Sequence, residues 1–282
     1  MFFKKLNIFI KSVFNYLNIL SLDAPLVVLF WQEIIATALY VDLILHHRIV
    51  LFFSVWLSYS ADRFLECYGR ISGPKLSSRH LFFYQNKFLF IKFWFGILIL
   101  AIYLAINFFP TSHLFISINI LFLVVFNQFL NFKTLKKISI YYCKDFRTAL
   151  ILSIGCVLYP FLNSNCGTIV HLLVPICLFG IFFGNCKLVK LWEWNLVSRD
   201  FNKHSFAFAH LLKFLYILLL LSGIYFLKNF KNLELFFISF VLNVFALRVF
   251  YISKSNFENR RILMDQVFWI IPCIIFLFSL CL

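Results

Sequence analysis

The sequence predicts an all-α membrane protein, a polytopic bundle of about nine transmembrane helices. Of the 282 residues, 63% are hydrophobic and only 13% are charged, and the mean hydropathy is +0.92. These values exclude an ordinary soluble domain. Several apolar stretches reach the roughly 20 residues that a helix needs to cross a hydrocarbon core. Helices are expected to do the spanning, because they satisfy their own backbone hydrogen bonds in lipid.

Apolar runs separated by polar and turn-forming segments predict nine helices in chain order. They cover residues 25–44, 49–67, 89–108, 112–131, 146–162, 168–189, 207–227, 233–252 and 263–281. Residues 1–22 are expected to form a cytoplasmic amino-terminal segment, and residues 23–282 a single transmembrane domain. The eight cysteines are scattered without a CxxC pair. Neither a disulfide framework nor a zinc site is therefore expected.

The basic residues predict the orientation of the chain, whose formal net charge is +15. With the amino terminus in the cytoplasm, all but three of the 26 Lys and Arg residues lie on that side or at nearby helix ends. The exceptions are Arg48, Lys228 and Lys231. This positive-inside pattern places the carboxyl terminus outside. The charge can also attract anionic membrane lipid, whereas a nucleic-acid partner is not expected, because no soluble basic domain exists to bind one.

Two acidic clusters lie where an apolar stretch meets a basic loop on the cytoplasmic side. In SYSADRFLE, residues Tyr59, Asp62 and Glu66 stand at i, i+3 and i+7 and so share one helix face. In WEWNLVSRD, residues Glu193 and Asp200 are again seven positions apart. Carboxylates at membrane depth are costly and indicate a functional site. Four carboxylates in a common cavity would repel one another unless a cation lay between them, which favours Mg²⁺.

Basic side chains near the two clusters favour a phosphate ligand. Their donors suit a polyphosphate held by the metal. A diphosphate at the cytoplasmic membrane surface is therefore the expected substrate fragment. The candidates are Arg63, Arg79, Lys144 and Arg147.

The two clusters resemble the aspartate-rich motifs of the UbiA superfamily of intramembrane prenyltransferases, which have nine helices. The first family motif has the form NDxxDxxxD and follows the second helix. Here Ser58 and Tyr59 stand in place of its Asn and leading Asp, whereas Asp62 and Glu66 match the following acids. The second family motif follows the sixth helix.

In that second motif, Glu193 matches the first acid and Asp200 the last, with Leu196 at a middle position. Four further stretches resemble a bacterial branch of UbiA-like proteins: SLDAPL, VWLSYSADR, SSRHLF and RRILMDQVFWIIP. The resemblance covers about residues 21–282. It implies an integral protein of the bacterial inner membrane.

The activity implied by the resemblance is Mg²⁺-dependent transfer of a prenyl group from a prenyl diphosphate to an aromatic or other lipid-soluble acceptor. The catalytic, metal-binding residues would be Asp62, Glu66, Glu193 and Asp200. The diphosphate would be bound by Arg63, Arg79, Lys144, Arg147 and Tyr59. Two expected acids are missing, and Glu replaces Asp at two further places, so the magnesium site is expected to be weakened.

Other interpretations of the same residues stay open. The chain could be a non-catalytic UbiA-like protein that binds lipid or assists assembly and whose metal site has decayed. A transporter is a weaker alternative, because no internal repeat is evident. Asp62 next to Arg63 could be a charge pair that only orients a helix end. Glu33 is expected to be paired within the bundle, and His46 with His47 indicates a metal only weakly.

Overall fold

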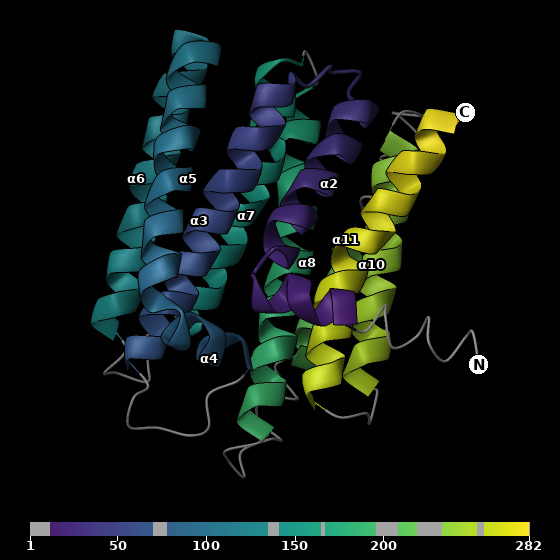
Figure 1. Cartoon of the computed structure of the whole chain (residues 1–282). Coiled ribbons are helices and arrows are strands. Elements are labelled where there is room, and N and C mark those ends of the chain that lie inside the picture. Colours follow the sequence, from purple (N-terminus) through teal and green to yellow (C-terminus); the bar gives the residue numbers. More distant parts are fainter. Residues whose placement is uncertain are drawn as a thin grey trace, which may run out of the picture. The chain divides into compact units, whose positions relative to one another are not determined.

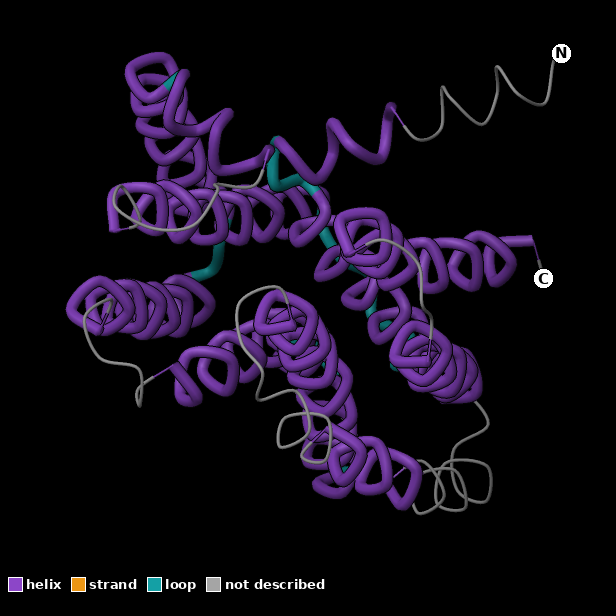
Figure 2. Tube along the Cα trace, turned by 90° about the horizontal axis from the view of Figure 1, so that it is seen from below, coloured by secondary structure: helices purple, strands orange, loops and turns teal. Residues whose placement is uncertain are grey.

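The fold is known from a computed structural model of the chain. It describes residues 12–69, 78–134, 141–164, 167–195, 208–218, 233–252 and 257–281. Within these ranges all regular secondary structure is helical, as Figure 2 shows. The all-α fold class is thereby confirmed, and the long apolar helices identify an integral membrane protein.

Nine labelled helices make up most of the described chain (Figure 1). They are α2 (Asp23–Ala38), α3 (Leu45–Gly69), α4 (Ser78–Gln85), α5 (Lys87–Phe108), α6 (Thr111–Thr134), α7 (Tyr141–Leu162), α8 (Thr168–Asn195), α10 (Glu234–Ile252) and α11 (Phe257–Cys281). Two shorter helices, Ser12–Ile19 and Phe208–Leu218, precede α2 and follow α8.

Six of the described helices are long and apolar enough to cross a membrane alone, namely α5, α6, α7, α8, α10 and α11. Helix Ser12–Ile19 and α2 qualify only as a pair, bent by 94°, which raises the number to seven. α3 is long enough but carries Asp62, Arg63 and Glu66, which lower its hydropathy. Of the expected span 207–227, residues 219–227 lie outside the described residues. The expected number of nine spans is therefore not confirmed.

The helix expected at 25–44 is shorter than predicted, because α2 ends at Ala38. Tyr40 adopts a left-handed backbone conformation with φ 53°. The amide of Val41 donates to the carbonyl of Ala36 at 2.9 Å, and that of Tyr40 to Thr37 at 3.2 Å. These two bonds form a Schellman cap, which satisfies the last carbonyls and stops the helix. Tyrosine is an unusual residue for that conformation, so the sequence gives no glycine signal for the end.

A second left-handed residue forms the corner between helix Ser12–Ile19 and α2. Ser21 has φ 57°, and the amide of Leu22 donates to the carbonyl of Leu17 at 2.9 Å. The side chain of Asn18 donates to Asp23 at 2.8 Å across the corner. These bonds hold the corner at which the chain turns by 94°.

The contacts within the chain define two compact units. Unit 1 comprises residues 1–29 and 44–144, and unit 2 comprises residues 30–43 and 145–282. In unit 1, α3 packs against α4, α5 and α6. Trp56 and Leu57 of α3 are buried together with Ala101 of α5, and the indole of Trp94 donates to the carbonyl of Leu57 at 3.0 Å. The expectation of a single domain stays a prediction.

In unit 2, α8, α10 and α11 contact one another. Two glycines one turn apart on α8, Gly180 and Gly184, allow close packing. A Cβ added at Gly180 would lie 2.6 Å from Cδ2 of Leu215 in helix Phe208–Leu218, and one at Gly184 would lie 3.0 Å from Leu247 of α10. This small-xxx-small spacing lets neighbouring helices approach where apolar burial gives little driving force in lipid.

We expect Gly180→Ala to destabilise unit 2 by about 1–3 kcal/mol, the usual cost of an added methyl in a packed interior. Leu215 is fully buried, so it has little room to move away. Thermal unfolding of the protein in detergent, followed by circular dichroism, measures the effect. The double variant Gly180→Ala/Leu215→Val shortens the side chain that the added methyl meets. It should recover part of the lost stability.

Gly96→Ala in α5 is the matched control, because nothing lies within 4 Å of a Cβ added there. It should leave stability unchanged or raise it by about 0.5–1 kcal/mol through helix propensity. Equal effects of the two substitutions would show that the packing at Gly180 is not close.

Candidate functional site

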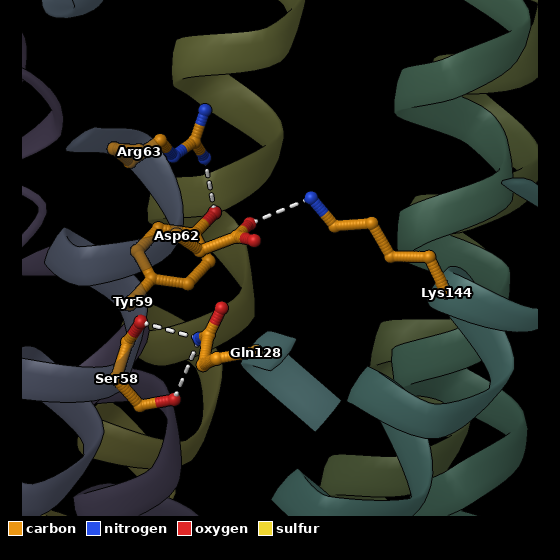
Figure 3. Close-up of polar contacts among 6 residues, drawn as sticks. All are labelled: Ser58, Tyr59, Asp62, Arg63, Gln128 and Lys144. Atoms are coloured by element: carbon orange, nitrogen blue, oxygen red, sulfur yellow. Dashed lines mark hydrogen bonds and ion pairs between the residues drawn. The ribbon is translucent and has the colours of Figure 1, made fainter. Parts of the chain in front are cut away.

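The candidate site is a polar stretch of α3 between Ser58 and Arg63, which Figure 3 shows together with its partners. Tyr59 and Asp62 are one helical turn apart, as the i, i+3 spacing predicts. Both side chains are partly buried, and Arg63 is buried. The residues belong to unit 1, as do their partners Gln128 of α6 and Lys144 of α7.

Asp62 forms an ion pair with Lys144, which is 82 positions further along the chain. The ammonium nitrogen lies 2.8 Å from Oδ2 of the carboxylate. The side chains of Lys144 and Asp62 are 21% and 18% exposed. At this partial burial the attraction is stronger than between surface charges, because water screens it less. The ammonium of Lys144 therefore binds the carboxylate that the family resemblance assigns to magnesium.

Tyr59 and Arg63 form a second pair, one turn apart on α3. The guanidinium donates to the Tyr59 hydroxyl, and its carbon lies 4.6 Å from the centre of the phenol ring. Both the hydroxyl and the ring face of Tyr59 thus attract the same cation. The first family motif has its leading Asp at the position of Tyr59. In this protein the tyrosine orients Arg63 instead.

Ser58 is held by Gln128, a residue that the sequence interpretation missed. The amide of Gln128 donates to the Ser58 carbonyl at 2.9 Å and contacts the Ser58 hydroxyl at 3.4 Å. These bonds attach α6 to the polar stretch of α3 (Figure 3). A glutamine inside an apolar span was the available signal, because such a side chain usually bonds to a neighbouring helix.

The structure thus brings together Tyr59, Asp62, Arg63 and Lys144 of the predicted site. Arg147 lies on α7 in unit 2 and is partly exposed. Glu66, Arg79 and Glu193 lie in α3, α4 and α8, but their side chains lie outside the described part. Asp200 lies outside the described residues altogether. Convergence of the four carboxylates stays a prediction, and the described residues contain no group of three His, Cys, Asp or Glu side chains suited to a metal.

No family model, curated protein or solved structure matches this chain.

A separate ion-pair cluster lies in unit 2, at the next residue of α7. Oδ2 of Asp145 lies 3.1 Å from the ammonium of Lys187 and 3.2 Å from that of Lys190, both on α8. The Lys187 ammonium also lies 5.1 Å from the ring centre of Phe183. Asp145 therefore links α7 to α8 and is itself engaged by two cations. Of the adjacent residues Lys144 and Asp145, the first belongs to the candidate site and the second to this link.

We expect the Asp62–Lys144 pair to have a coupling free energy of about 1–2 kcal/mol, between the values typical of exposed and of buried pairs. A double-mutant cycle of Asp62→Asn and Lys144→Gln, read by chemical denaturation in detergent, measures it. High salt should reduce the coupling only modestly, because the pair is partly buried.

Lys92→Gln is the control for charge removal, because Lys92 is an exposed lysine of α5. Its effect on stability should stay within about 0.5 kcal/mol. A coupling near zero between Asp62 and Lys144 would contradict a formed ion pair.

Proposed function

We propose that the protein binds a prenyl diphosphate at the polar stretch of α3 and, with Mg²⁺, transfers the prenyl group to an aromatic or other lipid-soluble acceptor. The observation that carries the proposal is the gathering of Tyr59, Asp62 and Arg63 of α3 with Lys144 of α7. We place the reaction at the cytoplasmic face of a bacterial inner membrane, as the charge pattern and the resemblance suggest. The amino terminus would be cytoplasmic and the carboxyl terminus outside.

Charge favours an anionic ligand here. Arg63 and Lys144 contribute two positive charges and Asp62 one negative charge, so these residues together carry a net charge of +1. A diphosphate would gain charge-assisted hydrogen bonds from the guanidinium and the ammonium. The exposed apolar side chains of α5 supply surface for a prenyl tail, with Phe93 and Phe95 among them.

Transfer requires that the carbon–oxygen bond to the diphosphate break while the acceptor bonds to the same carbon and loses a proton. Asp62, Glu66, Glu193 and Asp200 are the residues that would hold Mg²⁺, and the metal would neutralise charge on the leaving diphosphate. Lys144 engages Asp62 at 2.8 Å. We therefore propose that the ammonium moves from Asp62 to the diphosphate when the substrate binds, and so frees the carboxylate.

The same ion pair also favours a second candidate function, a non-catalytic protein that binds a phosphorylated lipid. Two positions that the resemblance assigns to acids are engaged with cations, because Asp62 pairs with Lys144 and Tyr59 with Arg63. Such pairs stabilise the helices without any metal. In this candidate the cations bind the phosphate, and no transfer follows.

Thermal stability with geranylgeranyl diphosphate distinguishes the two candidates. With Mg²⁺ and the ligand at about 100 times its dissociation constant, the transferase proposal predicts stabilisation by about 2.7 kcal/mol. Asp62→Asn should abolish the magnesium-dependent part, because it removes a carboxylate ligand. The shift is measured with and without Mg²⁺ in detergent-solubilised protein.

Asp42→Asn is the matched control, because Asp42 is an exposed carboxylate outside the candidate site. It should retain the full magnesium-dependent shift. A shift that needs no Mg²⁺ and is lost in Lys144→Gln would favour the non-catalytic candidate. The absence of any shift with prenyl diphosphates of several lengths would overturn the transferase proposal.

Lys144→Ala provides a separate test of the metal site. Because the substitution removes the cation that competes for Asp62, Mg²⁺ alone should bind about tenfold more tightly, equivalent to about 1.4 kcal/mol. Prenyl diphosphate should bind more weakly, since one of its donors is lost. Isothermal titration calorimetry measures both constants, with Lys92→Ala as the control that changes neither. Unchanged magnesium binding in Lys144→Ala would count against a metal site at Asp62.

A further inference from the structure

The ion-pair cluster of Asp145, Lys187 and Lys190 has more positive than negative charge. Both ammonium groups lie next to the same oxygen, Oδ2 of Asp145, at 3.1 and 3.2 Å. Two positive charges and one negative charge give the cluster a net charge of +1. The side chains of Lys187 and Lys190 are 20% and 13% exposed. The cluster is therefore partly desolvated but can still be reached from outside the protein.

Three phenylalanines of unit 2 lie beside this cluster. Phe146 of α7 packs edge-on against Phe179 and Phe183 of α8, with ring centres 5.0 and 6.2 Å apart. Phe179 and Phe183 stack on each other at 5.5 Å, and the ammonium of Lys187 lies 5.1 Å from the ring centre of Phe183. Phe146 is 49% exposed. A partly exposed aromatic surface therefore leads directly to the cations.

The spacing along α8 places the rings and the cations on one side of that helix. Phe179, Phe183 and Lys187 follow one another at intervals of four residues, and Lys190 comes three residues later. The apolar part of α8 that is long enough to cross a membrane covers Thr168–Trp192. Both lysines lie within its last two turns, where a span meets the headgroups, and the two rings lie deeper.

This order of rings and cations matches the two parts of an anionic phospholipid. Its acyl chains cover exposed apolar side chains in the hydrocarbon, and lysine ammonium groups donate charge-assisted hydrogen bonds to its phosphate. Basic pockets between membrane helices are a known way of binding anionic headgroups. The single negative charge of a phosphodiester balances the net charge of +1. A phosphocholine headgroup gains less, because it also brings a positive charge close to the two lysines.

We propose that the surface formed by the start of α7 and the end of α8 is a binding site for an anionic phospholipid such as phosphatidylglycerol. Lys187 and Lys190 bind the phosphate, and one acyl chain covers the exposed face of Phe146. Asp145 holds the two ammonium groups together, but its carboxylate also repels the phosphate and so limits the affinity. The site lies in unit 2 and does not depend on the prenyl transfer proposed for α3.

Two phospholipids with the same acyl chains test this site, dioleoylphosphatidylglycerol and dioleoylphosphatidylcholine. Each is titrated into the full-length protein in detergent, and native mass spectrometry measures the bound lipid. Phosphatidylglycerol should bind about tenfold more tightly. Equal affinities would overturn the proposal. Glycerol 3-phosphate, which has no acyl chain, should not bind at the same concentrations, and its binding as tightly as the lipid would overturn the assignment to a lipid.

The double variant Lys187→Gln/Lys190→Gln should lose the preference for phosphatidylglycerol, because it removes both phosphate donors. Lys92→Gln/Lys213→Gln is the matched control, since both of these lysines are exposed and lie outside the cluster. It removes the same number of charges and should retain the preference. An equal loss in the two double variants would show a general effect of net charge and would overturn the site.

Asp145→Asn tests the site in the opposite direction. Removing the carboxylate raises the net charge of the cluster from +1 to +2, so phosphatidylglycerol should bind about fivefold more tightly, while phosphatidylcholine binding stays unchanged. If the cluster only links α7 to α8, the substitution would leave phosphatidylglycerol binding unchanged or weaken it, and the proposal would be overturned. All samples lack Mg²⁺ and prenyl diphosphate, so the result is separate from the function proposed for α3.

Discussion

Lipid offers polar groups no hydrogen-bond partner, and this constraint determines where the polar side chains of the protein go. On the exposed faces of α5 and α6, Asn107 and Asn119 donate to carbonyls of their own helices at 2.8 Å. Inside unit 1 the donors cross between segments. The indole of Trp56 donates to the Leu20 carbonyl at 2.9 Å, and the bonds of Trp94 and Gln128 end on α3. α3 thus becomes the helix to which its neighbours are attached.

The candidate site is a special case of the same constraint. Along one turn and a half of α3, Ser58, Tyr59 and Asp62 each obtain a partner, from α6, from α3 itself and from α7 respectively. The partner of Ser58 is a neutral amide, whereas the partners of Tyr59 and Asp62 are cations. A site of this kind stabilises the bundle before any ligand binds, so structural and functional roles share the same residues. A ligand has to compete with bonds that already exist.

Sequence patterns predicted much of the fold because α5, α6 and α10 are almost uniformly apolar. Their ends, such as Lys87 and Phe108, lie within a few residues of the predicted ones. The end of α2 was missed because a tyrosine, not a glycine, adopts the left-handed conformation there. For the site, helix periodicity correctly placed Tyr59 and Asp62 on one face. The partner of Asp62 could not be predicted, because spacing along a helix contains no information about a lysine 82 positions away.

The corner before α2 determines what the first part of the chain can do in a bilayer. Helix Ser12–Ile19 lies at 94° to α2, so the two segments cannot both run along the membrane normal. The side chain of Asn18 holds helix Ser12–Ile19 to the start of α2 through Asp23. The same corner is bonded to α3 through Trp56 and Leu20, so the direction of the first helix is fixed relative to the helix that carries Asp62.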